Sequence, residues 1–395
     1  MTTPANTPAN TPADTPTDTP ADVPANTAAW IPAKHARLEV RPAPYPRPGA
    51  DQLVVRNRAL AINPLDWIIQ VEGSLTYGWL RYPTVLGADV AGEVVEVGTD
   101  VTRFRVGDRV IGHAVGTDKD SNSAAEGAFQ HYTAVPEKLA CPVPEAMAFE
   151  DAVVLPLAVS TAASGLFQTG HLGLRHPSAN PEPTGQTVLV WGGSTSVGGN
   201  AVQLAVAAGY EVVTTASPRN FDYVRALGAS LVFDYNSPTV VPDIIEAFQS
   251  RTLAGAIAFG ATSAASCVRI VRKCRGKKFV ALATAPVSFE HLGDPDRGRL
   301  AFPRLLSRLI GANIALQFAA RTRGVGLKYI FGTTLKTNEV GTAIYRDFLP
   351  AALADGSYLA APKPMVVGKS LDDIQAAMDL QRGGVSAAKV VVTLP

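Results

Sequence analysis

The chain has 395 residues, of which 47% are hydrophobic, a length and apolar content that suit two or three domains with large cores. Its 35 Lys and Arg nearly balance 34 Asp and Glu, and no obvious basic cluster is seen, which argues against a dedicated nucleic-acid or membrane-surface protein. The 3 cysteines are too scattered for a disulfide framework or a cysteine-rich zinc site, and we find no signal peptide or apolar run of membrane-spanning length.

These totals favour a cytoplasmic protein in a reducing compartment. At the N-terminus, residues 1–26 repeat a four-residue unit of the Thr-Pro-Ala-Asn type, without aromatic residues, Lys or Arg. Proline recurs too often there for a helix or a central strand. The composition predicts a disordered tail rather than a mitochondrial transit peptide.

The segment 27–158 contains short strand-like runs separated by Gly and Pro turns, which predicts a mostly antiparallel β-rich domain. An apolar helical pattern starts near residue 150. Residues 170–185 are rich in Pro, Gly, Asn and His, which is typical of a surface loop.

The most informative stretch is 187–209, where a short apolar run leads through a Gly/Ser turn into an alanine-rich helical pattern. A buried parallel strand followed by a glycine turn and a helix N-terminus forms an anion site. We therefore predict that a dinucleotide is bound by Gly192, Gly193, Ser194, Thr195, Ser196, Val197 and Gly198. The turn is not a regular G-x-G-x-x-G, and an ordinary strand–helix turn is the alternative.

The residues after the next expected strand, 211–216, indicate the cofactor. No acid stands at the strand tip to hold a ribose 2′-hydroxyl; Ser217, Arg219 and Asn220 follow instead. Arginine and serine side chains can bind a 2′-phosphate, so we predict NADPH. The alternative is that Arg219 is a solvated residue at a helix start.

Strand-like and helical runs then alternate, which predicts a parallel sheet covered by helices on both faces. We expect this domain to span 159–312, with 313–395 returning to the β-rich domain. Gly260 and Ala283 end two later strands, where ligands bind in open sheets. Tyr235 follows the third strand and is positioned to stack on adenine or reach the 2′-phosphate.

This order of parts, with the motifs at 61–66, 86–92, 106–110 and 389–392, resembles the medium-chain dehydrogenase/reductase superfamily over residues 28–395. The pieces at 191–195, 216–222 and 233–235 are similar to the quinone oxidoreductase and trans-enoyl reductase branch. The resemblance implies an α/β fold: a GroES-like β-rich catalytic domain joined to a doubly wound Rossmann domain.

Zinc-dependent members of the superfamily bind their catalytic metal through positions that correspond to Asn63, the segment 87–89 and Leu157. Ala88 and Leu157 cannot ligate a metal, and Asn63 is a poor zinc ligand. His113, His131 and Asp89 are scattered, and we expect no metal site.

Without a Lewis acid, the resemblance implies hydride transfer to an activated C=C bond or a quinone. We expect Asn63 to orient substrate or cofactor, Asp66 to act in catalysis or to hold loop backbone, and Tyr77 to donate a proton, as a tyrosine does in mitochondrial-type enoyl reductases. By the same resemblance, Thr161 lies near the nicotinamide ring, and Lys389 lies near the cofactor or the domain joint unless it is solvated.

Two further interpretations remain open. One is a trans-acting enoyl reductase that serves a polyketide synthase or its acyl carrier, although the sequence reveals no carrier-docking face. The other is a non-catalytic, crystallin-like NADPH-binding protein. Either a monomer or a homodimer fits the family, and the substrate is a small molecule of undefined identity.

Overall fold

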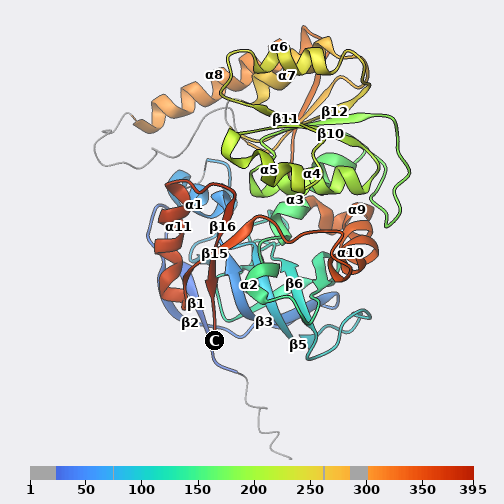
Figure 1. Cartoon of the computed structure of the whole chain (residues 1–395). Helices are drawn as coiled ribbons and strands as arrows, with labels where there is room; N and C mark the ends of the chain where they lie inside the picture. The colour runs from blue at the N-terminus through green and yellow to red at the C-terminus, as the bar shows by residue number, and fades with distance from the viewer. Residues whose placement is uncertain (1–23, 74, 261–262, 285–300) are drawn as a thin grey trace, which may run out of the picture.

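The computed structural model describes residues 24–73, 75–260, 263–284 and 301–395 (Figure 1). The expected tail, apart from residues 24–26, lies outside this part of the chain. Strand β1 already begins at Asn26, the last residue that we assigned to the tail. Figure 1 shows two units stacked on each other, with a parallel sheet in the upper unit and antiparallel strands in the lower one.

The lower unit holds two sheets, of strand order β2-β1-β4 and β15-β16-β3-β5-β6-β8, with β7 paired to β3. All pairs in them are antiparallel except β15 with β16. The strands are β1 (Asn26–Ile31), β2 (Glu39–Ala43), β3 (Gln52–Ala61), β4 (Thr84–Val85), β5 (Asp89–Val97), β6 (Arg109–His113), β7 (Tyr132–Pro136), β8 (Ala140–Pro142), β15 (Lys363–Gly368) and β16 (Ala388–Thr393). The β-rich character of this unit agrees with the predicted fold class, and the sheet includes β15 and β16 from the C-terminal segment.

The upper unit has six parallel strands in the order β11-β10-β9-β12-β13-β14. They are β9 (Thr187–Trp191), β10 (Glu211–Ala216), β11 (Leu231–Asp234), β12 (Leu253–Ala258), β13 (Phe279–Leu282) and β14 (Gly326–Tyr329). The connecting helices are α4 (Ser196–Ala207), α5 (Phe221–Ala226), α6 (Val240–Ala247), α7 (Ser263–Lys273) and α8 (Ala301–Arg321). The order reverses between β9 and β12, the switch point of a doubly wound fold, and the predicted fold class is confirmed.

The parallel sheet continues beyond residue 312, where we expected the chain to leave it. Strand β14 pairs in parallel with β13, with Phe279 opposite Gly326. Strand β14 has only four residues, and they include both polar and apolar side chains. The sequence therefore shows no apolar run that would predict it. The return to the lower unit therefore begins only after Tyr329.

The remaining helices join the units or cover the lower one: α1 (Pro64–Glu72), α2 (Phe149–Ala152), α3 (Pro156–Phe167), α9 (Glu339–Thr342), α10 (Leu349–Ala354) and α11 (Ile374–Arg382). The stretch Phe149–Phe167, which includes α3, is long and apolar enough to cross a membrane, contrary to our expectation. In this fold 72% of that stretch is buried, so it forms a core helix between the two units.

Strand register gathers polar residues from distant parts of the sequence. Ala61 of β3 lies opposite both Val391 of β16 and Asp89 of β5, and Asp89 lies opposite His113 of β6. Lys389 and Asn63 are each two residues from that row. The register therefore places Lys389, Asn63, Asp89 and His113 at the same end of the antiparallel sheet.

Candidate active site

A buried ion pair occupies this end of the sheet. The Nζ atom of Lys389 lies 2.9 Å from Oδ2 of Asp89, and the two side chains are 5% and 0% exposed. Lys389 also donates to Oδ1 of Asn63 at 2.6 Å. An ion pair removed from water needs further hydrogen bonds of this kind to offset the loss of hydration.

Asp89 connects three elements through the same carboxylate. Its Oδ2 accepts from the Asn63 side-chain amide at 2.8 Å, and its Oδ1 accepts from the backbone N–H of Leu157 at 2.6 Å. Leu157 stands in the first turn of α3, where a free N–H favours an anion. The carboxylate therefore ties β16 and the start of α1 to the start of α3.

Two expectations need correction here. Asn63 is 1% exposed, and its amide binds Asp89 and Lys389, so it is not free to orient substrate or cofactor. Lys389 is neither solvated nor free to bind a cofactor, since the residue is 4% exposed and its ammonium is already paired with Asp89. Both residues hold the protein's own structure in place.

Asp66 has a structural task that agrees with one of its two predicted roles. It is buried, and its Oδ2 accepts from the backbone N–H of Asn63 at 2.7 Å, which fixes the first turn of α1. Burial raises the pKa of Asp66 to about 7, and the nearby charge of Asp89 adds to this rise.

A second buried chain of hydrogen bonds fastens α3. His113 Nδ1 lies 2.9 Å from the Ser160 hydroxyl, which lies 2.7 Å from the Tyr345 hydroxyl. Tyr345 also donates to the carbonyl of Pro156 at 2.8 Å. Burial lowers the pKa of His113 to about 4, so this imidazole is neutral at physiological pH.

Tyr77 follows α1 and is half-buried, with its ring 5.2 Å from that of Trp79. Within the described chain its hydroxyl makes no hydrogen bond. Burial raises the pKa of Tyr77, and the charges of Glu72, Asp66 and Asp118 raise it further. The phenol is thus held in its protonated form with an O–H that is free to donate.

The positions that correspond to zinc ligands converge on the lysine ammonium. Asn63 and Asp89 bind it directly, Leu157 contributes only its backbone N–H to Asp89, and Ala88 has no donor atom. A cation already inside this niche repels a second one. Among the described residues no three His, Cys, Asp or Glu side chains gather around a common point, and His131 lies elsewhere, in a surface pocket with Arg56 and Tyr132.

The predicted dinucleotide turn follows β9 as expected. Gly192 has φ +91°, and a Cβ atom on Gly193 would lie 2.2 Å from Oγ1 of Thr214. A Cβ atom on Gly198 would lie 2.1 Å from the carbonyl oxygen of Gly192. Only glycine fits these three positions, so the α4 N-terminus lies close against the strand.

Thr195 closes the turn as the N-cap of α4. Its hydroxyl accepts from the N–H of Gly198 at 3.0 Å and donates to the carbonyl of Gly192 at 2.9 Å. The Ser196 hydroxyl oxygen is buried without a hydrogen-bond partner in the described chain. Ser196 and Val197 begin α4, close to Ser194 in the chain. Their backbone N–H groups have no carbonyl partner within the helix, so they are available to bind an anion.

The residues after β10 form a polar rim near this turn. The Asn220 amide donates to the hydroxyls of Ser217 and of Ser386, each at 3.2 Å, so a loop of the lower unit touches this rim. Arg219 is exposed, and no described residue pairs with its guanidinium. Tyr235 is 46% exposed, and its backbone N–H donates to Ala216. These features fit a phosphorylated ribose and an adenine.

The other expected cofactor residues border the same edge. Gly260 has φ +97°, and no atom lies within 4 Å of the position that a Cβ atom would take. Its backbone N–H donates to the Thr284 hydroxyl at 2.7 Å. Ala283 directly follows β13 and donates to the carbonyl of Ala258. Thr161 on α3 lies close to Gly332. A Cβ atom added to Gly332 would lie 2.8 Å from the Thr161 hydroxyl.

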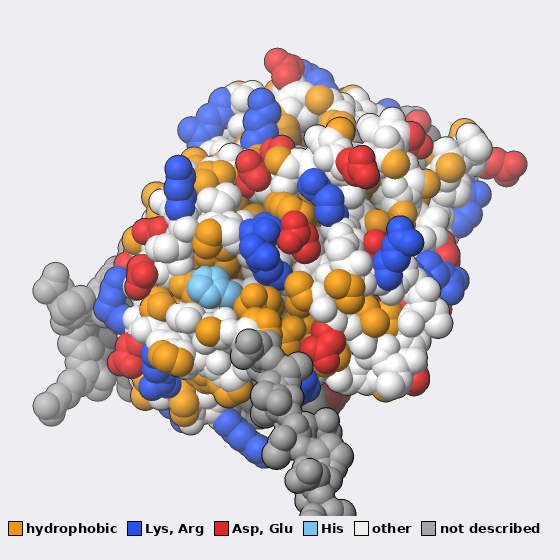
Figure 2. Space-filling view, turned by 90° about the horizontal axis from the view of Figure 1, so that it is seen from below, with side chains coloured by type: hydrophobic (Ala, Val, Ile, Leu, Met, Phe, Trp, Pro, Cys, Tyr) orange, Lys and Arg blue, Asp and Glu red, His pale blue; other side chains and the backbone are white. Residues whose placement is uncertain are grey.

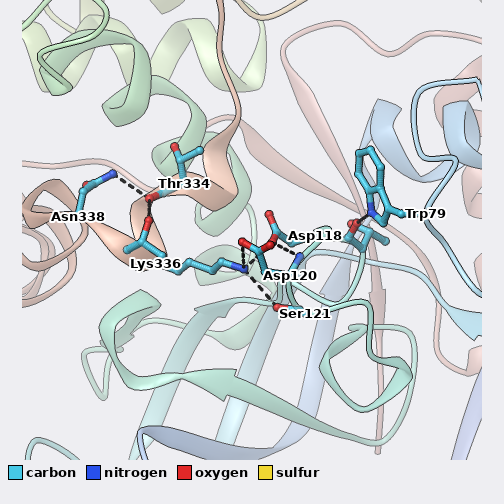
Figure 3. A network of polar contacts seen from close by, with 9 residues as sticks. Trp79, Asp118, Asp120, Ser121, Thr334, Lys336 and Asn338 are labelled. Atoms are coloured by element: carbon cyan, nitrogen blue, oxygen red, sulfur yellow. Dashed lines mark hydrogen bonds and ion pairs between the residues drawn. The ribbon is translucent and has the colours of Figure 1, made fainter.

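Sequence reasoning missed a polar bridge between the segment after β14 and the loop after β6, shown in Figure 3. Lys336 on the 3₁₀ segment η5 (Gly332–Thr337) pairs with Asp118 in the loop after β6 and lies 3.9 Å from Asp120. Although burial opposes it, hydrogen bonds from Lys336 and Thr333 lower the pKa of Asp118. The same loop also binds Trp79 from the segment after α1, because Nε1 of Trp79 donates to the carbonyl of Thr117 at 3.1 Å.

Comparison with known proteins agrees with this geometry. Residues 49–145 match the family described as the alcohol dehydrogenase GroES-like domain. The dehydrogenase pigH of Monascus ruber is 51% identical, with 93% of this chain and 99% of pigH covered. The trans-enoyl reductase himH of Aspergillus japonicus is 38% identical over 93% of this chain and 97% of its own. A mycobacterial structure complexed with NADPH, Rv1454c, superimposes with a TM-score of 0.65 at 21% identity, covering 93% of this chain and 99% of that one.

Proposed function

This chain is an oxidoreductase of the medium-chain dehydrogenase/reductase superfamily, and we propose that it uses NADPH to reduce a C=C bond conjugated to a carbonyl group, without a catalytic metal. The substrate class that we favour is an enoyl thioester, with enones and quinones as further acceptors. The similarity to a protein named as a trans-enoyl reductase supports this choice.

The observation that carries the proposal is the position of the Lys389 ammonium among Asn63 and Asp89. Alcohol oxidation in this superfamily relies on a metal ion to stabilise an alkoxide. Here the Lys389 ammonium fills the niche, where it is buried and bound by Asp89 and Asn63. Reduction of an activated C=C bond needs only hydrogen-bond donors for the charge on the carbonyl oxygen.

NADPH is the cofactor that the turn and rim fit best. The N-terminus of α4 and Gly192 to Gly198 suit a pyrophosphate, because the glycines leave room for a close approach. Arg219, with Ser217 beside it, suits a 2′-phosphate. When bound, NADPH supplies a hydride, which forms the new C–H bond at the β-carbon of the substrate.

Tyr77 is the proton donor in this proposal. The hydride leaves negative charge on the carbonyl oxygen and α-carbon of the substrate, and a proton then completes the C–H bond at the α-carbon. The raised pKa of Tyr77 keeps its O–H protonated, so a proton is present to be given. Solvent can restore this proton, because the ring is only half-buried.

The test is the rate of NADPH oxidation with an enoyl thioester in Tyr77→Phe. We expect kcat to fall about 100-fold while the Kd for NADPH stays unchanged, as for the loss of a general acid. Tyr82→Phe is the matched control, because the Tyr82 hydroxyl donates to the carbonyl of Gly73 at 3.0 Å and serves packing. Equal rates in Tyr77→Phe and wild type would remove Tyr77 from the mechanism.

A further inference from the structure

Helix α8 exposes a stripe of large apolar side chains. Ile310, Ile314 and Phe318 are 51%, 65% and 69% exposed, and their spacing of four residues places them on one face of the helix. The opposite face is used by the protein itself, since Leu316 and Ala320 are buried against the core of the upper unit. A contiguous exposed apolar stripe of this kind marks an interaction site.

The net charge of +1 conceals a strong asymmetry around this helix. Residues 247–338 hold 15 Lys and Arg but only 3 Asp and Glu, so the rest of the chain is acidic. Our expectation that the chain lacks a basic cluster is therefore wrong. It failed because the total charge averages a basic segment with an acidic remainder.

Basic side chains border the apolar stripe. Arg304, Arg308 and Arg321 are exposed on α8 itself. The exposed Arg272 and Lys273 end the neighbouring helix α7, which packs on α8. On the lower face of the molecule, by contrast, acidic and basic side chains are interspersed (Figure 2). The positive field is thus concentrated on the side of α8.

The N-terminal half of α8 also packs against the lower unit, close to the candidate active site. Leu305 and Leu309 pack against the apolar cluster of the lower unit that contains Trp67 and on which Tyr77 rests. In Figure 1, α8 extends past the parallel sheet above α1 and α11. A partner seated on α8 would therefore stand next to the apolar cluster against which Tyr77 packs.

Resting on the function proposed above, we infer that α8 is the docking helix for an acyl carrier domain that presents the enoyl thioester. Such a domain is acidic and carries its acyl group on a phosphopantetheine arm, so its charge complements Arg304, Arg308 and Arg321. Ile310, Ile314 and Phe318 supply the desolvated centre of the contact.

Two other occupants fit this surface less well, one because of its charge and one because of the narrow apolar stripe. A second copy of α8 packed across a two-fold axis would bring basic side chains against basic side chains. An interfacial helix on a membrane inserts a broad apolar face, whereas the large apolar side chains exposed by the described part of α8 are the single stripe of Ile310, Ile314 and Phe318.

The experiment compares two substrates that differ only in the carrier: crotonyl-pantetheine and a crotonyl-loaded acyl carrier domain of a polyketide synthase. Two double variants of the full chain are measured, Ile314→Ser with Phe318→Ser, and Arg304→Glu with Arg308→Glu. Controls on the lower unit are Val106→Ser, a residue 63% exposed, and Arg47→Glu, also exposed.

We expect kcat/KM for the carrier-bound substrate to fall about tenfold or more in both α8 variants, while that for crotonyl-pantetheine stays within about twofold of wild type. The controls should leave both values unchanged. A wild type that does not prefer the carrier-bound substrate, or α8 variants that retain the preference, would overturn the inference and leave the proposed function standing.

Binding of the fluorescently labelled carrier is measured in parallel by anisotropy, so that docking is decided even if neither substrate turns over. Carrier binding that the α8 variants lose supports docking, whatever becomes of the reductase proposal. Binding to phosphatidylserine vesicles is measured for the same proteins. If wild type does not bind the carrier, or if the α8 variants lose vesicle binding but keep carrier binding, the inference is contradicted.

Discussion

The Nζ atom of Lys389 and the Oδ2 atom of Asp89 are 2.9 Å apart, although 299 positions separate the two residues in the chain and neither side chain is more than 5% exposed. Removing one member of such a pair leaves a buried charge without a partner. Lys389→Met should therefore lower the free energy of unfolding by about 3–5 kcal/mol.

The double variant Asp89→Asn with Lys389→Met should recover part of that loss, because both charges are then absent. Urea denaturation of the two single variants and the double variant measures the coupling. Additive effects of the two substitutions would mean that the pair contributes little in this environment.

Asp66 should make stability depend on pH. Its pKa is raised to about 7 in the folded protein from an ordinary value of 3.8. The protonated carboxyl thus contributes stability that is fully present below the lower value and is lost as pH rises through the higher one. Asp66→Asn cannot ionise, so from about pH 4 to pH 8 its unfolding free energy should gain roughly 1–4 kcal/mol relative to wild type. Parallel pH profiles for the two proteins would contradict a raised pKa. His113 titrates in both and cancels from the difference.

Arg219→Ala should discriminate between the two nicotinamide cofactors. Loss of a charge-assisted contact to a 2′-phosphate costs about 1.5–3 kcal/mol, so the Kd for NADPH should rise about 10- to 100-fold. The Kd for NADH should not change. Arg225→Ala is the matched control, because Arg225 is already paired with Asp222 at 3.0 Å. Fluorescence titration measures both constants, and an equal loss for NADH would refute the assignment of Arg219.

Gly193→Ala should disrupt the dinucleotide turn by steric overlap. The added Cβ atom would lie 2.2 Å from Oγ1 of Thr214, so the backbone of the turn must shift. We expect a lower melting temperature and the loss of NADPH binding. Gly311→Ala, in the middle of α8 with no atom within 4 Å of its Cβ position, should instead stabilise the protein by up to about 1 kcal/mol. NADPH binding that survives in Gly193→Ala would show that the turn is not the pyrophosphate site.

The sequence predicts those parts of the molecule that depend on local patterns. The glycine turn at Gly192, the alternating strands and helices, and the doubly wound class follow from residues that are neighbours in the chain. The ion pair of Asp89 with Lys389 does not, because only the register of the three strands β16, β3 and β5 brings the two together. Asn63 was expected to orient substrate or cofactor for the same reason: the sequence does not show that its partners are Asp89 and Lys389. The apolar spacing on α8 was present in the sequence, but no local signal tells an exposed stripe from a buried one.

The most direct test of metal-free hydride transfer to a C=C bond uses NADPH that carries deuterium at both hydrogen positions of the nicotinamide C4, with crotonyl-pantetheine as substrate. The product should carry deuterium at the β-carbon, and the rate should be the same with and without EDTA. Deuterium at the carbonyl carbon, a product without the label, or loss of turnover in EDTA would contradict the proposed reaction and the role given to Lys389.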